Sequence, residues 1–323
     1  MYMQFRTPIN IPPFDFRIDY STRGVLVGSC FADSIGARMK ALKLPVAVNP
    51  FGVLFNPLSV AGCLETLEAC RIYTQDELET DGERWYSFDF HGSLAGLSAG
   101  EALANMNDAV RAGSQALASA DYLVITLGTA WVYELGEGGR TVANCHKAPA
   151  SRFTRRRLSV GEIAERLGPL LARLAATRHV ILTVSPVRHL KDGLAENQLS
   201  KATLRVAADE LARISDRIVY FPAYEALMDD LRDYRFYAPD MIHPSAVAVD
   251  YIWELFRGAA LSDEAIAATA EIAKIAAAAA HRPLNPASEA YRAFRRSMYE
   301  AAQALAQRHP EIDLAAELNL FGS

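Results

Sequence analysis

Long hydrophobic runs are missing from this sequence. No apolar run reaches the ~18 residues that a membrane-spanning helix needs, and the alanine-rich run at 275–280 ends at His281, Arg282 and Pro283. The first residues, 1–8, lack the basic-then-apolar order of a secretory signal peptide. We therefore expect a cytoplasmic protein that has no membrane partner.

Positive charge is also scarce. The chain has 33 Lys and Arg against 38 Asp and Glu, which gives a net charge of −5. This balance lacks the basic footprint of a protein that binds nucleic acid. The one tight basic cluster, at residues 155–157, is interpreted as a solvated loop. We expect no nucleic-acid partner.

Metal-binding and nucleotide-binding motifs are absent too. Neither the four cysteines nor the seven histidines have the spacing of a metal site, and there is no P-loop and no G-x-G-x-x-G after the first predicted strand. We therefore expect no metal and no nucleotide cofactor. Without a secretory signal the cysteines are expected to be reduced thiols; they are Cys30, Cys63, Cys70 and Cys145.

What the sequence does contain is an alternation of short apolar runs with amphipathic segments. Five apolar, β-branched runs predict strands at 24–27, 45–48, 122–127, 179–184 and 217–221. Apolar residues three and four apart predict helices at 32–42, 58–70, 101–118, 160–178 and 196–214. This pattern indicates a doubly wound α/β domain with a mostly parallel sheet that is covered on both faces.

Two insertions and a C-terminal extension modify this pattern. Residues 84–91 alternate as a strand does, and 131–134 with 140–144 predict a hairpin with a flexible glycine-rich tip at 136–139. After residue 258 no strand is predicted, and Ser262 and Ser288 are positioned to cap helices that run to about residues 280 and 308. We predict an α/β domain at 1–258 and a helical extension at 259–323, which is a candidate surface for homo-oligomer formation or for covering the cleft.

Reactive side chains follow the first predicted strand. Gly28 allows a sharp turn, and Ser29 and Cys30 come directly after it, before the predicted helix. A nucleophile in this place meets the positive end of a helix, which favours an anionic nucleophile or an oxyanion. From this segment alone, an ordinary junction in which Ser29 caps the helix is an equally good interpretation.

A second pair follows the last predicted strand. Asp240 lies three residues before His243, and Pro244 is suited to the first turn of the next helix. An Asp at this spacing can hold the imidazole in one tautomer and orient it toward a nucleophile. Because ligands of doubly wound sheets bind at the carboxyl ends of the strands, both pairs are expected at the same edge of the sheet.

Residues 28–32 spell G-S-C-F-A, and the sequence resembles the GSCFA-domain proteins, which belong with the SGNH/GDSL hydrolases. The resemblance covers roughly residues 5 to 257. It implies a flavodoxin-like, three-layer fold with His243 as general base and Asp240 as its orienting partner. The third position of the related G-D-S motif attacks the substrate, so the resemblance favours Cys30 as nucleophile. Ser29 remains the alternative.

The resemblance also implies donors for an oxyanion. Gly52 occupies the place of the glycine after the second strand, but Ala130 stands where relatives carry an asparagine. Thr129, Asn144 and Asn56 are candidate replacements for this asparagine. Loss of one such donor costs ~10²–10³ in rate elsewhere.

Other polar residues are candidates for substrate contacts. Arg188 and His189 follow the fourth predicted strand and are candidates to bind an anionic group of the substrate. Further candidates along the same rim are Lys191, Asn197 and Lys201. His146 is a candidate for substrate contact only.

Together these features predict an acyl esterase or O-acyltransferase. Its substrate would be a small-molecule or glycan acyl ester or thioester, and the acyl group would pass through a covalent acyl-enzyme. Carbohydrate-linked acyl groups are what the resemblance suggests. The alternative is a glycan-binding module that retains the fold and has lost catalytic activity, which the missing asparagine favours.

Overall fold

The computed structural model describes residues 6–136 and 139–322, and its centre is a five-stranded parallel sheet. Its strand order is β2-β1-β5-β9-β10. The strands are β1 (Gly24–Gly28), β2 (Val46–Val48), β5 (Tyr122–Leu127), β9 (His179–Val184) and β10 (Ile218–Tyr220). All five lie where the apolar runs predicted them. Strands β1, β5 and β9 are almost wholly buried, which explains their continuous apolar sequence.

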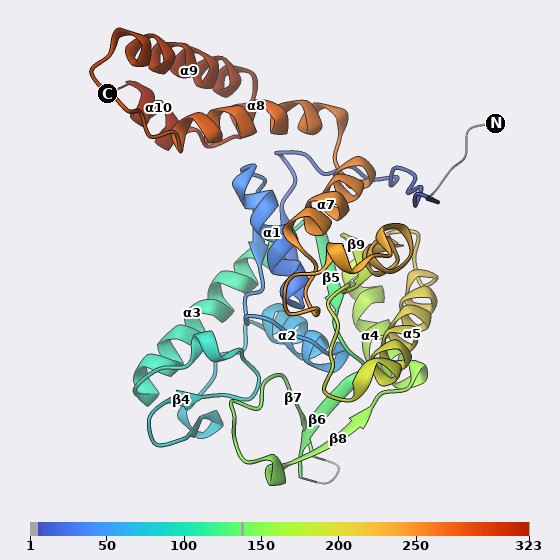
Figure 1. The fold of residues 1–323 in the computed structure, drawn as a ribbon. Helices are drawn as coiled ribbons and strands as arrows, with labels where there is room; N and C mark the ends of the chain where they lie inside the picture. Colours follow the sequence, from blue (N-terminus) through green and yellow to red (C-terminus); the bar gives the residue numbers. More distant parts are fainter. Residues whose placement is uncertain (1–5, 137–138, 323) are drawn as a thin grey trace, which may run out of the picture.

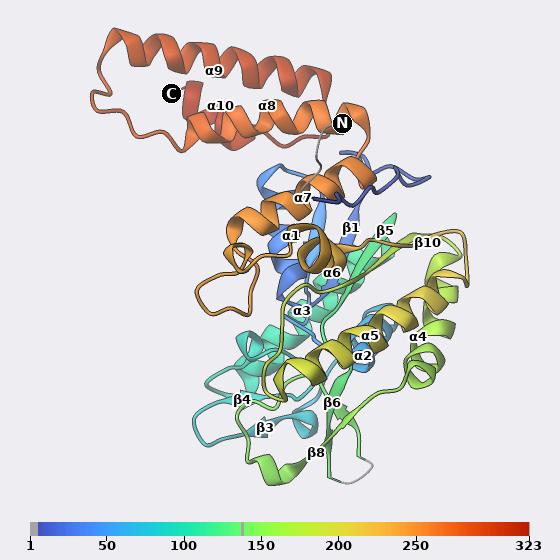
Figure 2. The ribbon, with the colours of Figure 1, turned by 45° about the vertical axis from the view of Figure 1, so that its right-hand side comes forward.

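Helices cover both faces of this sheet (Figures 1 and 2), and the arrangement confirms the predicted three-layer α/β fold. Alternate residues of β1 point to opposite layers: Val25 and Val27 pack with one group of helices, and Leu26 packs with the other. The first group is α2 (Pro57–Ala69), α3 (Ala99–Ala118), α4 (Val160–Ala175) and α5 (Gly193–Ala212). The second is α1 (Cys30–Ala41) and α7 (Ala246–Ala260). Between β10 and α7 lie α6 (Ala223–Glu225) and a π-helical turn at Ala226–Leu231.

The two insertions form small antiparallel sheets beyond one end of the central sheet (Figure 1). The first insertion is a short hairpin of β3 (Glu79–Thr80) and β4 (Trp85–Tyr86). Only β4 lies within the predicted strand at 84–91, and residues 87–91 are not strand. The second insertion has the order β7-β6-β8, with β6 (Trp131–Leu135), β7 (Thr141–Val142) and β8 (Phe153–Arg157). The predicted hairpin is confirmed, except that residues 137–138 of its tip lie outside the described residues.

The interpretation of residues 155–157 as a solvated loop is wrong. They belong to β8, whose side chains alternate between half-buried and exposed along the strand. Because alternate residues of a strand point to opposite faces, Arg155 lies on the half-buried face although it stands in a run of three arginines. Tertiary pairing with β6 decides the structure here, and local charge does not.

The C-terminal extension is helical, as predicted, and lies at the far end of the molecule from the insertions (Figure 1). Ser262 and Ser288 cap α8 (Asp263–Ala279) and α9 (Glu289–Arg308), because each hydroxyl accepts a backbone N–H. A third helix, α10 (Ala315–Gly322), was not predicted. The apolar side chains of the extension share one core with α1 and α7. None of the helices in the described ranges has the length and apolarity to cross a membrane.

Candidate functional site

The turn after β1 is fixed by its backbone. Gly28 has a φ of +141°, and a Cβ atom there would lie 2.1 Å from the carbonyl oxygen of Thr126. Its N–H donates to Oδ1 of Asn49 over 2.8 Å, and Nδ2 of Asn49 donates to the carboxylate of Asp33 over 2.7 Å. Only glycine tolerates this conformation at this distance from a neighbouring strand. The turn therefore presents the two residues that follow it in one defined orientation.

Ser29 and Cys30 have different roles in this turn. Helix α1 begins at Cys30, two residues earlier than predicted, and Ser29 is its N-cap. Ser29 is 1% exposed and its hydroxyl accepts the N–H of Phe31 over 3.3 Å. Cys30 is partly exposed and carries a free thiol. This placement favours Cys30 over Ser29 as the reactive side chain.

The surroundings of Cys30 keep its thiol protonated. Burial and the nearby carboxylate of Asp33 raise the pKa of Cys30 above its usual value. The N–H groups of Cys30 and Phe31 and the amine of Lys201 oppose this effect without reversing it. In this arrangement the thiol needs a proton acceptor before it can act as a nucleophile.

Cys30 borders a cavity of about 370 Å³, the Cys30 cavity, at the carboxyl ends of β1, β5 and β9. Its position agrees with the rule for ligand sites of doubly wound sheets. The second insertion closes one side of the cavity with residues of β6, β7 and β8. Eight of the predicted site residues line it: Ser29, Cys30, Asn56, Thr129, Asn144, Arg188, His189 and Lys191. Gly52, His146, Asp240 and His243 are not among the lining residues.

Among the predicted oxyanion donors, Asn144 is the best placed. The N–H groups of Gly128 and Thr129 both donate to the carbonyl oxygen of Phe55 over 2.8 Å, so the loop after β5 offers no free donor at these two residues. Asn56 caps α2, with its oxygen accepting the N–H of Ser59. The side-chain oxygen of Asn144 accepts the N–H of His146, and its Nδ2 has no partner among the described residues.

Gly52 and His146 have structural roles. The N–H of Gly52 donates to the carbonyl oxygen of Asn49 over 2.7 Å, and a Cβ at Gly52 would lie 2.4 Å from His91. His146 is buried, and its Nε2 lies 3.0 Å from the carbonyl oxygens of both Ser87 and Phe90. Burial lowers the pKa of His146. The expectation that His146 contacts substrate therefore has no support from its position.

His189 lines the Cys30 cavity, and Lys201 is buried beside it. Nε2 of His189 lies 3.3 Å from the hydroxyl of Thr129, and burial lowers the pKa of His189 to about 4, so the imidazole is neutral. Lys201 is 1% exposed, and its Nζ donates to the carbonyl oxygens of Gly128 over 2.6 Å and Ser185 over 2.7 Å. Because Gly128 and Ser185 line the cavity, the Lys201 amine lies directly behind its wall.

His243 and Asp240 form the predicted pair. Nδ1 of His243 lies 2.7 Å from Oδ2 of Asp240, and Oδ1 accepts the N–H groups of Ile242 and His243. These hydrogen bonds lower the pKa of Asp240 to about 2. The pair leaves Nε2 of His243 as the available nitrogen, and both side chains are about half exposed. The N–H of Arg188 donates to the carbonyl oxygen of Ile242, which ties this loop to the cavity wall.

Arg155 and Cys145 are cavity residues that the sequence analysis did not identify. The guanidinium of Arg155 stacks on Trp131 at 4.4 Å and forms an ion pair with Asp192, in which Nη2 lies 2.5 Å from Oδ2. Arg155 could have been found from residues 153–157, whose side chains alternate between half-buried and exposed as in a strand, but the run of three arginines favoured a loop.

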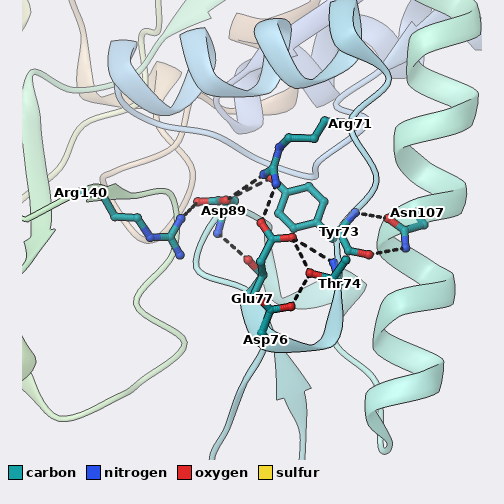
Figure 3. Close-up of polar contacts among 9 residues, drawn as sticks. Arg71, Tyr73, Thr74, Asp76, Glu77, Asp89, Asn107 and Arg140 are labelled. Carbon is teal, nitrogen blue, oxygen red and sulfur yellow. Dashed lines mark hydrogen bonds and ion pairs between the residues drawn. The ribbon is translucent and has the colours of Figure 1, made fainter.

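A second cavity, of about 400 Å³, lies beyond Ala143, which lines both cavities. Figure 3 shows the polar side chains at its edge, where the charges neutralise one another. Asp89 accepts a 2.6 Å bond from Arg140 and a 3.1 Å bond from the hydroxyl of Tyr73, and Arg71 pairs with Glu77. This network holds the first insertion against the second. The charged residues that line this cavity, Glu65, Arg71 and Asp89, are all paired, so we place the functional site in the Cys30 cavity.

The fold and the cavity define the class as a three-layer α/β protein that has a ligand-sized cavity at the carboxyl edge of its sheet, with a cysteine at a helix N-terminus. The family model of the GSCFA family matches residues 23–256, and that of the GSCFA domain protein, C-terminal domain, matches residues 272–323. The chain belongs to the GSCFA family. No curated protein matches it.

Proposed function

We propose that this chain is an acyl esterase or O-acyltransferase of the SGNH type that uses Cys30 as its nucleophile. The observation that carries the proposal is the position of Cys30: it is the first residue of α1, follows the strained turn at Gly28, and borders a cavity of about 370 Å³. A cavity of this size accommodates a small ligand. The helix N-terminus favours the negative charge that develops during acyl transfer.

The reaction would proceed in two displacements. His243 accepts the proton of the Cys30 thiol, and the sulfur forms a bond to the carbonyl carbon of the ester. The bond from that carbon to the alcohol oxygen breaks, and the alcohol leaves with the proton from His243. Water or a sugar hydroxyl then attacks the thioester, gives its proton to His243, and releases the Cys30 thiolate, which takes the proton back. The groups proposed for the oxyanion are Nδ2 of Asn144 and the N–H of Cys30, the first residue of α1.

The general base is essential in this scheme because burial keeps the Cys30 thiol protonated. Asp240 orients His243 through Nδ1 and leaves Nε2 for proton transfer. Since His243 is not a cavity-lining residue, the scheme requires the loop at 238–245 to carry it toward Cys30. The free state of all four cysteines supports a cytoplasmic location, where thiols remain reduced.

Hydrolysis of p-nitrophenyl acetate tests the proposal. We expect Cys30→Ala to abolish turnover and His243→Ala to reduce it by ~10²–10⁴, the usual contribution of general acid–base catalysis. Cys145→Ala is the matched control, since Cys145 is a second thiol of the same cavity, and should retain activity. Full activity in Cys30→Ala would refute the proposed nucleophile.

The second candidate is a glycan-binding module without turnover. It is favoured by the loop after β5, where the N–H groups of Gly128 and Thr129 are both bonded to Phe55 and cannot stabilise an oxyanion. Glycan binding by the unmodified chain, together with no hydrolysis of any acyl donor tested, would support this candidate over the enzyme.

A further inference from the structure

The charged side chains that line the Cys30 cavity are all cations. They are Arg155, Arg188 and Lys191, and within residues 6–136 and 139–322 no aspartate or glutamate lines the cavity. The chain as a whole carries an excess of carboxylates, with a net charge of −5. The cations come from two segments, β8 and the loop after β9, and their excess is a local property of this cavity that the composition of the chain does not explain.

Two of these cations have no ion-pair partner within the described residues. The guanidinium of Arg188 lies 3.9 Å from the ring centroid of Tyr237, which holds it in place without neutralising it. Nζ of Lys191 donates to the hydroxyl of Tyr133 over 2.5 Å, another neutral group. Asp192, which follows Lys191 in the chain, is bound by both Nη atoms of Arg155. The positive charge of Arg188 and Lys191 thus remains available to a ligand.

Further donors strengthen the positive potential of the wall. Nε1 of Trp131 and Nε of Arg155 are buried and have no acceptor among the described residues. Clefts lined by charges of one sign, with walls of low polarity, concentrate ligands of the opposite sign.

The remaining walls are flat and apolar. Phe55, Trp131, Tyr133, Val142 and Val187 supply them. An aromatic or aliphatic group of a ligand gains from burial against such side chains, at roughly 25 cal/mol for each Å² removed from water. The cavity volume of about 370 Å³ is at the lower end of the range for small-molecule sites.

We propose that the ligand of the Cys30 cavity is a small amphipathic anion, in which a carboxylate or phosphate group contacts Arg188 and Lys191 and an apolar group lies against Trp131 and Tyr133. This inference rests on the proposed function in one respect: if the chain is an acyl esterase or acyltransferase, its substrate is an acyl ester or thioester that carries an anionic group. Anion binding itself requires no catalysis. In the second cavity, by contrast, Asp89 and Glu77 neutralise the arginines.

Calorimetric titration of the whole chain with three probes of similar shape tests this inference. The probes are phenyl phosphate, benzoate and neutral benzamide. We expect at least one of the two anions to bind about tenfold or more tightly than benzamide, and the affinity to fall as KCl is raised. The stronger of the two anions then identifies whether phosphate or carboxylate is the recognised group.

Variants locate the binding. Arg188→Gln and Lys191→Gln should each weaken the anion about tenfold and leave benzamide unchanged, because they remove charge and keep a polar side chain. The matched control is Arg111→Gln on α3, an exposed arginine outside the cavity, which should have no effect. Equal affinity for benzamide and the anions, or no change in the Arg188 and Lys191 variants, would overturn the inference.

These outcomes are separable from those of the proposed function. A chain that binds the anions but never releases an acyl product would leave this inference standing and refute the esterase. Rapid cleavage of neutral esters, with no preference for anions, would support the esterase and refute the inference of an anionic ligand.

Discussion

The buried Lys201 should make the stability of this protein depend on pH in a way that one substitution removes. Its Nζ has two acceptors, the carbonyl oxygens of Gly128 and Ser185, and no third hydrogen-bond acceptor among the described residues. A neutral amine has two N–H bonds and fits this site, whereas the ammonium has three. Burial lowers the pKa of Lys201 from its usual 10.5 to about 7.

The sign follows from proton linkage. Between about pH 7 and pH 10 the unfolded chain keeps the proton on this lysine while the folded chain has released it, so the free energy of unfolding increases with pH. The increase is about 1.4 kcal/mol for each pH unit, or roughly 4 kcal/mol over the interval. Lys201→Met has no such group. It also leaves the two carbonyl oxygens without a donor, at a cost of about 1–3 kcal/mol each at every pH.

Urea unfolding followed by circular dichroism, at several values between pH 7 and pH 10, measures both effects. Other titrating groups, such as the buried tyrosines, are common to both proteins and cancel in the comparison. We expect the wild-type chain to exceed Lys201→Met by a margin that grows by several kcal/mol as the pH rises. Lys40→Met, at an exposed lysine of α1, should show no such growth. A margin that is constant from pH 7 to pH 10 would refute the reasoning.

Two further predictions concern the turn and its thiol. Gly28→Ala should lower the free energy of unfolding by about 2–6 kcal/mol, because the positive φ and the clash with a neighbouring strand each cost about 1–3 kcal/mol. The control is Gly62→Ala, where nothing lies within 4 Å; it should leave the free energy of unfolding unchanged or raise it by up to about 1 kcal/mol. Equal unfolding midpoints for the two variants would contradict this account. Because the Asp33 carboxylate raises the pKa of Cys30, Asp33→Asn should increase the rate at which iodoacetamide alkylates Cys30 at pH 8, measured by peptide mapping with the exposed Cys70 as the internal reference. An unchanged or slower Cys30 rate would show that Asp33 does not control this thiol.

The central sheet could be predicted from sequence because parallel strands buried on both faces are continuous apolar runs. The helix caps at Ser262 and Ser288 were equally visible, since capping depends on local sequence. The secondary structure of residues 155–157 could not be predicted. A run of three arginines has the local character of a solvated loop, and only pairing with β6 makes it a strand.

The candidate site was predictable to the extent that strand ends determine it. Thr129, Arg188 and His189 follow strands of the central sheet, and the structure places them on one cavity. Arg155 and Cys145 reach the same cavity from the second insertion, whose docking depends on contacts between segments far apart in sequence. The helix start at Cys30 was predicted two residues late, because alanine at 32 is a stronger helix former than the cysteine and phenylalanine before it.

The most direct test of the central claim is the mass of the chain after brief exposure to p-nitrophenyl acetate, followed by peptide mapping. The account predicts one acetyl group on Cys30, which is absent from Cys30→Ala and does not accumulate in His243→Ala. An acetyl group on Ser29 would contradict the choice of nucleophile. Turnover without any adduct, or an adduct on Cys145 or Lys191 that persists in His243→Ala, would contradict covalent acyl catalysis at this site.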